Sequence, residues 1–212
     1  MIPEFLRRPR PVYHGRRDRA AVALTFDDGP SRWTAAVAGA LERHGCRGTF
    51  FLLGVSLEED PETAAALAAA GHELGNHLYS HHDPAELTDH EVLSELARTD
   101  ALLHGATGSE PRLVRPPYCS DPKRVARIAG RQRPVVLRTV DPADWRTEDP
   151  AAIVAAVLDA AAAGDIVLLH DGVPPVNRGT PSREATVAAV EELVPALIGR
   201  GLRPVTVSEL LA

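Results

Sequence analysis

Short apolar runs alternate with longer segments typical of helices along most of the chain. The apolar runs have the length of buried strands, and the segments between them carry capping residues of helices. We predict strands at 21–26, 48–54, 113–118, 134–141, 165–171, at the start of 72–77 and in the closing stretch RPVTVSELLA. We predict helices at 31–45, 60–71, 88–105, 121–130, 149–164 and 182–201, the last broken or kinked near Pro195.

Strands that alternate with helices are typical of a parallel sheet with right-handed crossovers. The pattern therefore predicts an α/β fold with about seven parallel strands in a closed or nearly closed barrel. The 212 residues suit a single domain, which we place at 20–212, behind an N-terminal arm at 1–19. In such folds the functional side chains lie at the carboxyl ends of the strands.

Composition narrows the range of partners. The net charge is −6, from 23 Lys and Arg against 29 Asp and Glu, which argues against a nucleic-acid-binding surface. No apolar stretch approaches the roughly 18–20 residues of a membrane helix. One cluster of arginines is expected to be a solvated arm, and it comprises Arg7, Arg8, Arg10, Arg16, Arg17 and Arg19.

The N-terminal stretch MIPEFLRRPRPVYHG lacks the apolar core of a secretory signal. We therefore expect a cytoplasmic protein from the sequence as it stands, or a secreted or cell-wall protein if an export segment has been trimmed. The two cysteines, Cys46 and Cys119, form no CxxC pair, so neither a disulfide framework nor a cysteine zinc site is indicated.

Polar side chains gather where the predicted strands end. Asp27 and Asp28 close the first strand, where two adjacent carboxylates cost free energy unless something uses them. His77 and His81 follow the third strand. Later strand ends carry Arg115, Asp141, Asp144, Trp145, His170 and Asp171. A parallel barrel would bring all of these to one rim, and this convergence is a stronger indication than any single residue.

The spacing of the two histidines indicates a metal site. His77 and His81 are four positions apart, so both imidazoles face the same way if the segment after the third strand turns helically. Two imidazoles with one carboxylate form a metal site with open positions, the arrangement of catalytic zinc or iron.

Each of these residues also has a plain structural interpretation. The histidines could be surface residues of the polar run HLYSHHD, and Asp27-Asp28 could form a turn or a helix cap. Arg115 could make a surface ion pair, and His170 could bond a backbone carbonyl. These interpretations hold separately, but they are hard to sustain together at successive strand ends.

Five stretches, TFDDGP, HLYSH, RPPY, DPADW and LLHD, resemble in this order the motifs of NodB-type polysaccharide deacetylases, carbohydrate esterase family four. The resemblance runs from about residue 20 to about residue 210. It implies a distorted (β/α) barrel. It also implies metal-dependent removal of N-acetyl or O-acetyl groups from sugars of chitin, peptidoglycan or related glycans.

The resemblance assigns a role to each matched residue. The metal ligands would be Asp28, His77 and His81. The catalytic groups would be Asp27 as general base, Arg115 orienting it, the Tyr118 backbone N–H at the oxyanion, Asp144 supporting the histidine and His170 as general acid. The acetyl pocket and its surroundings would contain Trp145, Leu168, Pro116 and Pro117. Zn²⁺ is the expected ion, and Co²⁺ or Ni²⁺ also fit the donor set.

Two positions depart from the family pattern. Leu78 stands at a position where the family usually has Ser or Thr, whose hydroxyl steadies the ligand loop. Cys119 stands where Gly is common. Neither change removes a catalytic group, so both affect the expected substrate more than the reaction. A packing role is expected for Cys119, because free cysteines are usually buried and inert.

The sequence is consistent with three functions. The leading one is a metal-dependent deacetylase of an acetylated carbohydrate. The second is a metal amidohydrolase of a small N-acyl metabolite or a cyclic amide, which the missing export signal motivates. The third is a catalytically silent carbohydrate-binding domain, which the complete set of ligands, base and acid disfavours. The sequence does not indicate an oligomeric state.

Overall fold

The computed structural model describes residues 11–130, 133–177 and 182–212. Within these ranges six strands form one parallel sheet in the order β4-β3-β2-β1-β5, with β6 paired to the amino-terminal half of β1. The strands are β1 (Ala21–Asp27), β2 (Thr49–Leu52), β3 (Glu73–Asn76), β4 (Leu113–Val114), β5 (Ile166–His170) and β6 (Arg203–Val205). The predicted parallel α/β fold is therefore confirmed.

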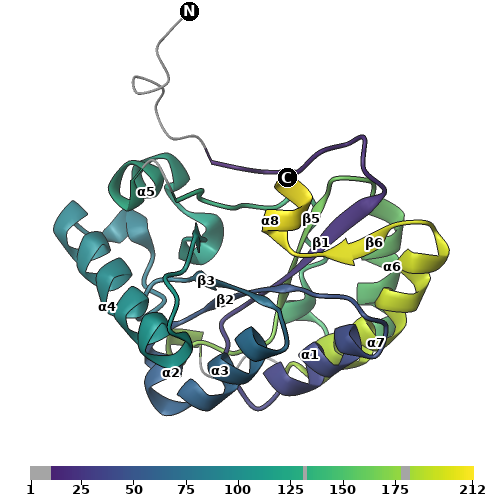
Figure 1. Cartoon of the computed structure of the whole chain (residues 1–212), viewed down its shortest axis with the longest axis horizontal. Helices are drawn as coiled ribbons and strands as arrows, with labels where there is room; N and C mark the ends of the chain where they lie inside the picture. The colour runs from purple at the N-terminus through teal and green to yellow at the C-terminus, as the bar shows by residue number, and fades with distance from the viewer. Residues whose placement is uncertain (1–10, 131–132, 178–181) are drawn as a thin grey trace, which may run out of the picture.

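Helices surround this sheet, with α4 and α5 on one side of the strands and α6 and α7 on the other (Figure 1). Asp-Pro starts α3 and α6, and in each case the Asp side chain accepts a backbone N–H of the first turn, as the sequence predicts. The helices are α1 (Thr34–Glu42), α2 (Gly54–Glu59), α3 (Pro61–Ala69), α4 (Asp89–Thr107), α5 (Pro122–Ala129), α6 (Pro150–Ala160), α7 (Glu184–Gly199) and α8 (Val207–Leu211).

The alternation of side chains along β1 separates the core from the site. Leu24 and Phe26 pack in the largest apolar cluster, under the helices α1 and α7. Successive side chains of a strand point to opposite faces, so Ala23, Thr25 and Asp27 face the other way. Ala23 joins the cluster on that second face, and polar residues occupy it farther along the strand. The carboxylate of Asp27 thus lies buried at the carboxyl end of the sheet.

The opposite end of β1 is covered by α8. Val207 and Leu210 are fully buried against Ala23 and Phe51. The Val207 N–H also donates to Thr49 Oγ1 at 2.9 Å, at the start of β2. The buried carboxylate of Asp27 and the helix α8 therefore lie toward opposite ends of β1.

The expected strand at 134–141 is wrong as a regular strand. This segment makes isolated bridges to β4 at Val114↔Val135 and to β5 at Val140↔Val167. Its backbone hydrogen bonds are divided among three partners, because the Leu137 N–H turns away to the carbonyl of Val12. The segment lies between the two edges of the sheet without forming a seventh strand, and no continuous ladder closes the described part of the barrel.

Three smaller expectations also change. β4 ends at Val114 rather than at 118, because Pro116 and Pro117 have no N–H to donate to a ladder. α7 is not broken at Pro195, which lies on the exposed side while Leu193 and Leu197 remain buried. The sequence pattern also missed two short helices, α2 and α8.

Residues 11–19 lie against the domain. The Val12 N–H donates to Val135 at 2.8 Å, and the Gly15 N–H donates to Gly164 at 2.8 Å. Arg17 forms an ion pair of 2.7 Å with Asp165. Among the arginines of the expected arm, Arg7, Arg8 and Arg10 lie outside the described residues. No helix in the described ranges has the length and apolar character to span a membrane.

Candidate active site and metal centre

The carboxyl ends of the strands bring most of the predicted residues together. Asp27 pairs in register with His170 of the neighbouring strand β5, so the proposed base and acid come from adjacent strands. His77 follows β3 directly, and Arg115 follows β4. The convergence that the strand-end pattern predicts is therefore present in the structure.

Asp28, His77 and His81 form a compact buried group. Their potential ligand atoms all lie within 4.8 Å of one another. Asp28 Oδ1 is 3.4 Å from His77 Nε2 and 3.2 Å from His81 Nε2. This oxygen is buried and has no hydrogen-bond partner within the described residues. A buried carboxylate oxygen without a partner is costly, and a divalent cation facing two imidazole nitrogens would satisfy it.

The neighbouring charges support this interpretation. Burial by itself would raise the pKa of Asp28, but the contacts with His77 and His81 hold that pKa well below its usual range. His77 Nδ1 lies 2.7 Å from the Arg115 carbonyl, which can only accept, so Nδ1 carries the proton. Nε2 of His77 therefore faces Asp28, and a proton shared between these two atoms would have to leave before Nε2 could bind an ion.

The loop between the histidines is not a helical turn, so the helical expectation for this segment is wrong. Leu78 and His81 both have a φ of 63°, in the left-handed region, which costs about 1–2 kcal/mol per non-glycine residue. The loop is held by side chains from elsewhere. Asn76 Oδ1 accepts the Leu78 N–H at 2.7 Å, and Glu95 on α4 accepts two further backbone N–H groups at 2.8–2.9 Å.

Arg115 and Asp27 form a buried ion pair beside this group. Arg115 is fully buried, and its Nη1 donates to Asp27 Oδ1 at 2.7 Å and to Thr25 Oγ1 at 2.8 Å. Its Nε and Nη2 donate to the carbonyls of Val136 and Leu137. The guanidinium is thus fixed from several directions, and it orients the Asp27 carboxylate and offsets its charge.

His170 and Asp144 form the second charged pair. His170 Nδ1 lies 2.7 Å from Asp144 Oδ1, and Asp144 Oδ2 accepts the His170 N–H and the Thr186 hydroxyl. Burial alone would lower the pKa of His170, but Asp144, with smaller contributions from Asp28 and Asp27, raises it to about 9. The imidazole is therefore charged at neutral pH and able to donate a proton.

The remaining predicted residues border this centre. Tyr118 lies in the 3₁₀ turn η3 (Pro117–Cys119), with a φ of 57° and an exposed side chain. Its ring meets the His81 ring edge-on, with 4.7 Å between centroids. Pro116 and Pro117, which precede Tyr118 in the chain, are both buried. Leu168 is buried on β5, opposite Thr25 in the register.

Trp145 follows Asp144 in the turn η4 (Asp144–Arg146), and its half-buried ring lies 4.3 Å from the Arg146 guanidinium carbon. Asp141, which the strand-end pattern also singled out, pairs with Arg138 at 2.8 Å and accepts the Ala143 N–H. Its contacts are those of a turn residue.

The two departures from the expected pattern are accommodated differently. Leu78 is fully buried in an apolar cluster with Val92 and Val114, so it anchors the loop by packing rather than by a hydroxyl. Cys119 has a φ of 52°, a conformation that glycine adopts without strain. Burial raises the pKa of its thiol, as expected for an inert packing cysteine.

Asp171 is a buried residue whose role the sequence pattern missed. Its N–H donates to the Asp27 carbonyl at 3.0 Å, and its carboxylate accepts the Thr34 hydroxyl at 2.5 Å. The Ser31 hydroxyl donates to its carbonyl oxygen. These bonds tie the loop after β1, which carries Asp28, to the end of β5. Burial, aided by Asp28 and Asp27, raises the pKa of Asp171 to about 7.

Comparison with known proteins gives a consistent result. The family model described as polysaccharide deacetylase matches residues 14–133. A peptidoglycan-N-acetylglucosamine deacetylase of Bacillus cereus is 36% identical over 194 residues, covering 90% of this chain and 87% of that protein. A chitooligosaccharide deacetylase of Bradyrhizobium is 36% identical over 188 residues, covering 85% of this chain and 86% of that protein.

A solved structure of a peptidoglycan N-acetylglucosamine deacetylase superposes with a TM-score of 0.87 at 30% sequence identity. The superposition covers 94% of this chain and 92% of that chain. The likeness therefore extends over nearly the whole chain.

Proposed function

This chain belongs to the polysaccharide deacetylase family, and we propose that it removes N-acetyl groups from an acetylated glycan of the chitooligosaccharide or peptidoglycan type. The observation that carries the proposal is the buried group of Asp28, His77 and His81 beside the Arg115–Asp27 pair. Relatives that act on both types of glycan support the substrate class.

The three-residue group fits a divalent ion, since its unpartnered carboxylate oxygen faces two imidazole nitrogens. Asp28, His77 and His81 would hold the ion, and Zn²⁺ suits two imidazoles and a carboxylate, as do Co²⁺ and Ni²⁺. When bound, the ion would supply Lewis-acid polarisation of water and of the acetyl carbonyl.

Asp27 is the proposed general base. Its Oδ1 is occupied by Arg115, and its Oδ2 lies 3.7 Å from His77 Nε2, on the side of the three-residue group. Oδ2 would therefore take the proton from the attacking water. The Tyr118 backbone N–H is the proposed donor to the oxyanion, and a donor of this kind contributes about 2.7–4 kcal/mol to catalysis.

His170 is the proposed general acid. Asp144 holds Nδ1, so the proton on Nε2 is the one to be given to the departing amine. As the carbon–nitrogen bond breaks, the sugar nitrogen takes this proton and leaves as an amine, and the acyl part leaves as acetate. The base and the acid thus have separate partners, the Arg115 guanidinium for Asp27 and the Asp144 carboxylate for His170.

The test is acetate release by the zinc-loaded protein from N-acetylated chitooligosaccharides and peptidoglycan fragments. Asp27→Asn should lower turnover by about 100- to 10,000-fold, the usual range for loss of a general base, and leave zinc content unchanged. Asp159→Asn, an exposed change on α6, is the matched control and should behave as the parent protein.

The same assay separates the alternatives. Small N-acetyl metabolites are included in the screen, and acetate release confined to them would replace the glycan assignment. Glycan binding without acetate release from any amide, at full zinc occupancy, would show a silent binding domain and overturn the proposed reaction.

A further inference from the structure

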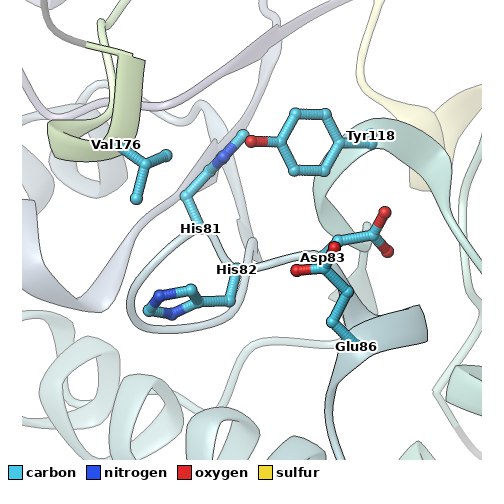
Figure 2. Close-up of a pocket in the computed structure, with 6 residues that line it drawn as sticks. All are labelled: His81, His82, Asp83, Glu86, Tyr118 and Val176. Atoms are coloured by element: carbon cyan, nitrogen blue, oxygen red, sulfur yellow. The ribbon is translucent and has the colours of Figure 1, made fainter.

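A pocket of about 310 Å³ opens next to His81. Figure 2 shows the side chains that line it, which come from three separate segments of the chain. They are His81, His82 and Asp83 from the loop after β3, Glu86 from the turn η2 (Pro84–Glu86), Tyr118 from η3, and Val176 from the turn η5 (Pro175–Asn177). A pocket of this size lies at the lower end of the range for small-ligand sites.

The walls of this pocket differ in character. Tyr118 and Val176 are exposed, with 55% and 47% of their surface accessible, so they offer an aromatic and an apolar face. Below Tyr118 in the view of Figure 2, Asp83 and Glu86 offer carboxylates. An apolar wall facing a few polar groups is the usual composition of a site for one sugar-sized ring.

The two carboxylates are not neutralised by basic neighbours in the described part of the chain. Asp83 accepts the Ala85 N–H at 2.9 Å, which caps the turn, and Glu86 makes no side-chain hydrogen bond or ion pair with the described residues. The nearby Arg124 is directed elsewhere, to the Pro84 and Leu87 carbonyls and to Asp89. The described lining contains no Lys or Arg, so Asp83 and Glu86 are the groups in it that would attract a cationic part of a ligand.

A second feature marks the pocket as a place for a ligand. His81 is buried, and its Nδ1 has no hydrogen-bond partner within the described residues. Its Nε2 is the nitrogen that lies 3.2 Å from Asp28, so the ring joins the candidate metal centre to this pocket. Buried polar atoms without a partner are uncommon in native proteins and often mark a missing ligand or ion.

We propose that this pocket is a subsite for the sugar next to the one being deacetylated, and that it selects a sugar with a free amine over one with a carboxylate. The inference rests on the proposed function, since it places the pocket beside the reacting acetyl group. An ammonium group would lie near Asp83 and Glu86, with the ring against Tyr118. A carboxylate-bearing sugar or peptide would meet like charges.

This selection has a consequence for the order of reaction on a glycan. The reaction releases an amine on the sugar ring, and at slightly acidic pH that amine is mostly protonated. A chain that already contains one deacetylated unit would therefore bind better than a fully acetylated chain. The preferred substrate class would be a partly deacetylated glucosamine oligosaccharide rather than a glycan rich in carboxylates.

The first test measures binding without turnover. A fully deacetylated glucosamine tetramer carries amines and no acetyl group, and its affinity for the zinc-loaded protein is measured by calorimetry at low salt. Glu86→Gln and Asp83→Asn should each weaken binding by about two- to fivefold, the range for a partly exposed charge pair. Asn at position 83 keeps the cap on the Ala85 N–H. Added salt should reduce the difference.

The matched control is Glu192→Gln, which removes the same charge from an exposed position on α7. It should bind the tetramer as the parent protein does. Equal affinity in the parent, Glu86→Gln and Asp83→Asn proteins would overturn the inference, as would a loss of the same size in the control.

The second test measures selectivity. The ratio of kcat/KM for an N-acetylated glucosamine oligomer to that for a muramic-acid-bearing fragment is determined for each variant. Removing both carboxylates should lower this ratio by about 4- to 25-fold, from two contributions of two- to fivefold. Acetate release with an unchanged ratio would leave the proposed function intact and refute the subsite. Absence of acetate release would refute the function, and the tetramer titration would still decide the charge preference.

Discussion

Two neighbouring aspartates at the end of β1 have entirely different surroundings. Asp27 is paired with the buried guanidinium of Arg115, whereas Asp28 faces two imidazoles and has an unpartnered oxygen. The positive φ of Asp28, 78°, turns its side chain away from the direction that a continuing strand would give it. Adjacent like charges therefore coexist because each has its own counter-charge or its own candidate ligand.

At this scale the ionisation of His170 gives a pH prediction. The pKa of His170 is raised to about 9, so the acid is protonated below that pH and activity should fall as the pH rises through it. Asp144→Asn removes the main cause of this rise, and the pKa should fall. The alkaline limb of the kcat profile should then move to lower pH, with a loss of about tenfold or more at pH 8.

Thr186→Val is the control for this change. It removes the hydroxyl that donates to Asp144 but keeps the carboxylate charge, so the alkaline limb should stay close to pH 9. A profile of Asp144→Asn that superimposes on the parent profile would show that Asp144 does not set the protonation of the acid.

The motif residues could be predicted from the sequence because they lie at or just after the carboxyl ends of predicted strands. The supporting residues could not. Glu95 lies mid-helix with no distinguishing pattern, and Asp171 follows the proposed acid as one more polar residue. Their roles depend on which backbone groups the fold brings to them, and this information is absent from local spacing.

At the scale of elements, the loop 77–81 depends on the helix α4. Glu95 accepts the N–H groups of Tyr79 and Ser80 and also the Ser80 hydroxyl. Two left-handed residues make the loop costly on its own, so these bonds hold the imidazoles in position. The helix thus positions both candidate ligands without contacting the ion site itself.

Glu95→Ala should therefore weaken zinc binding. Loss of groups that orient metal ligands typically costs 10- to 100-fold in affinity, and we expect about tenfold here. The dissociation constant for zinc is measured by competition with a chromophoric chelator, together with the free energy of unfolding of the zinc-free protein.

Glu91→Ala on the same helix provides the comparison. It breaks the capping box with Thr88 and should lower stability by about 0.5–2 kcal/mol without touching the loop. Zinc affinity should be nearly unchanged in this variant. An equal loss of affinity in both variants would mean that α4 stability, rather than the Glu95 contacts, controls the site.

The type of each element was largely predictable, but the residues at which the elements begin and end were less so. The capping box at Thr88 and Glu91 and the Asp-Pro starts mark helices through local chemistry that needs no tertiary partner. The segment 134–141 has the apolar pattern of a strand, but its hydrogen bonds go to three different partners. Which partner each residue meets is decided by the closure of the fold, which hydrophobic periodicity does not encode.

At the scale of the whole molecule, the two ends of the sheet have separate tasks. One end is sealed by α8, and the other carries the charged residues, with the Phe51 ring in between under the Arg115 guanidinium. The buried charges of that end are tolerated because the rest of the chain provides a large apolar core. An ion bound there should stabilise the entire domain, because it binds only the folded arrangement of its ligands.

Zinc should accordingly raise the melting temperature. At about 100 times its dissociation constant, a ligand of the native state contributes about 2.7 kcal/mol. For a domain of this size that corresponds to about 5–10 °C. Asp28→Asn should abolish most of this shift, whereas Asp27→Asn should keep it, and thermal unfolding with and without zinc or chelator measures both. The same shift in Asp28→Asn as in the parent protein would place the ion elsewhere.

The parallel α/β architecture was predictable as a whole, because alternation of strands and helices leaves few other solutions. The order of strands was not, since β6 joins β1 beside β2 rather than extending an edge of the sheet. In this arrangement the amino-terminal half of β1 pairs with β6, whereas its carboxyl-terminal half pairs with β2.

The position of β1 also bears on synthesis. Leu24 pairs with Val167, and Ala23 pairs with Ile166 and Val205, so β1 waits during translation for partners that are made much later. Until then the nascent chain carries an apolar strand with one edge unpaired, next to two bare carboxylates. Such long-range pairing is slow and exposes the chain to aggregation. The candidate site can therefore assemble only after translation has passed His170, long after Asp27 and Asp28 have been made.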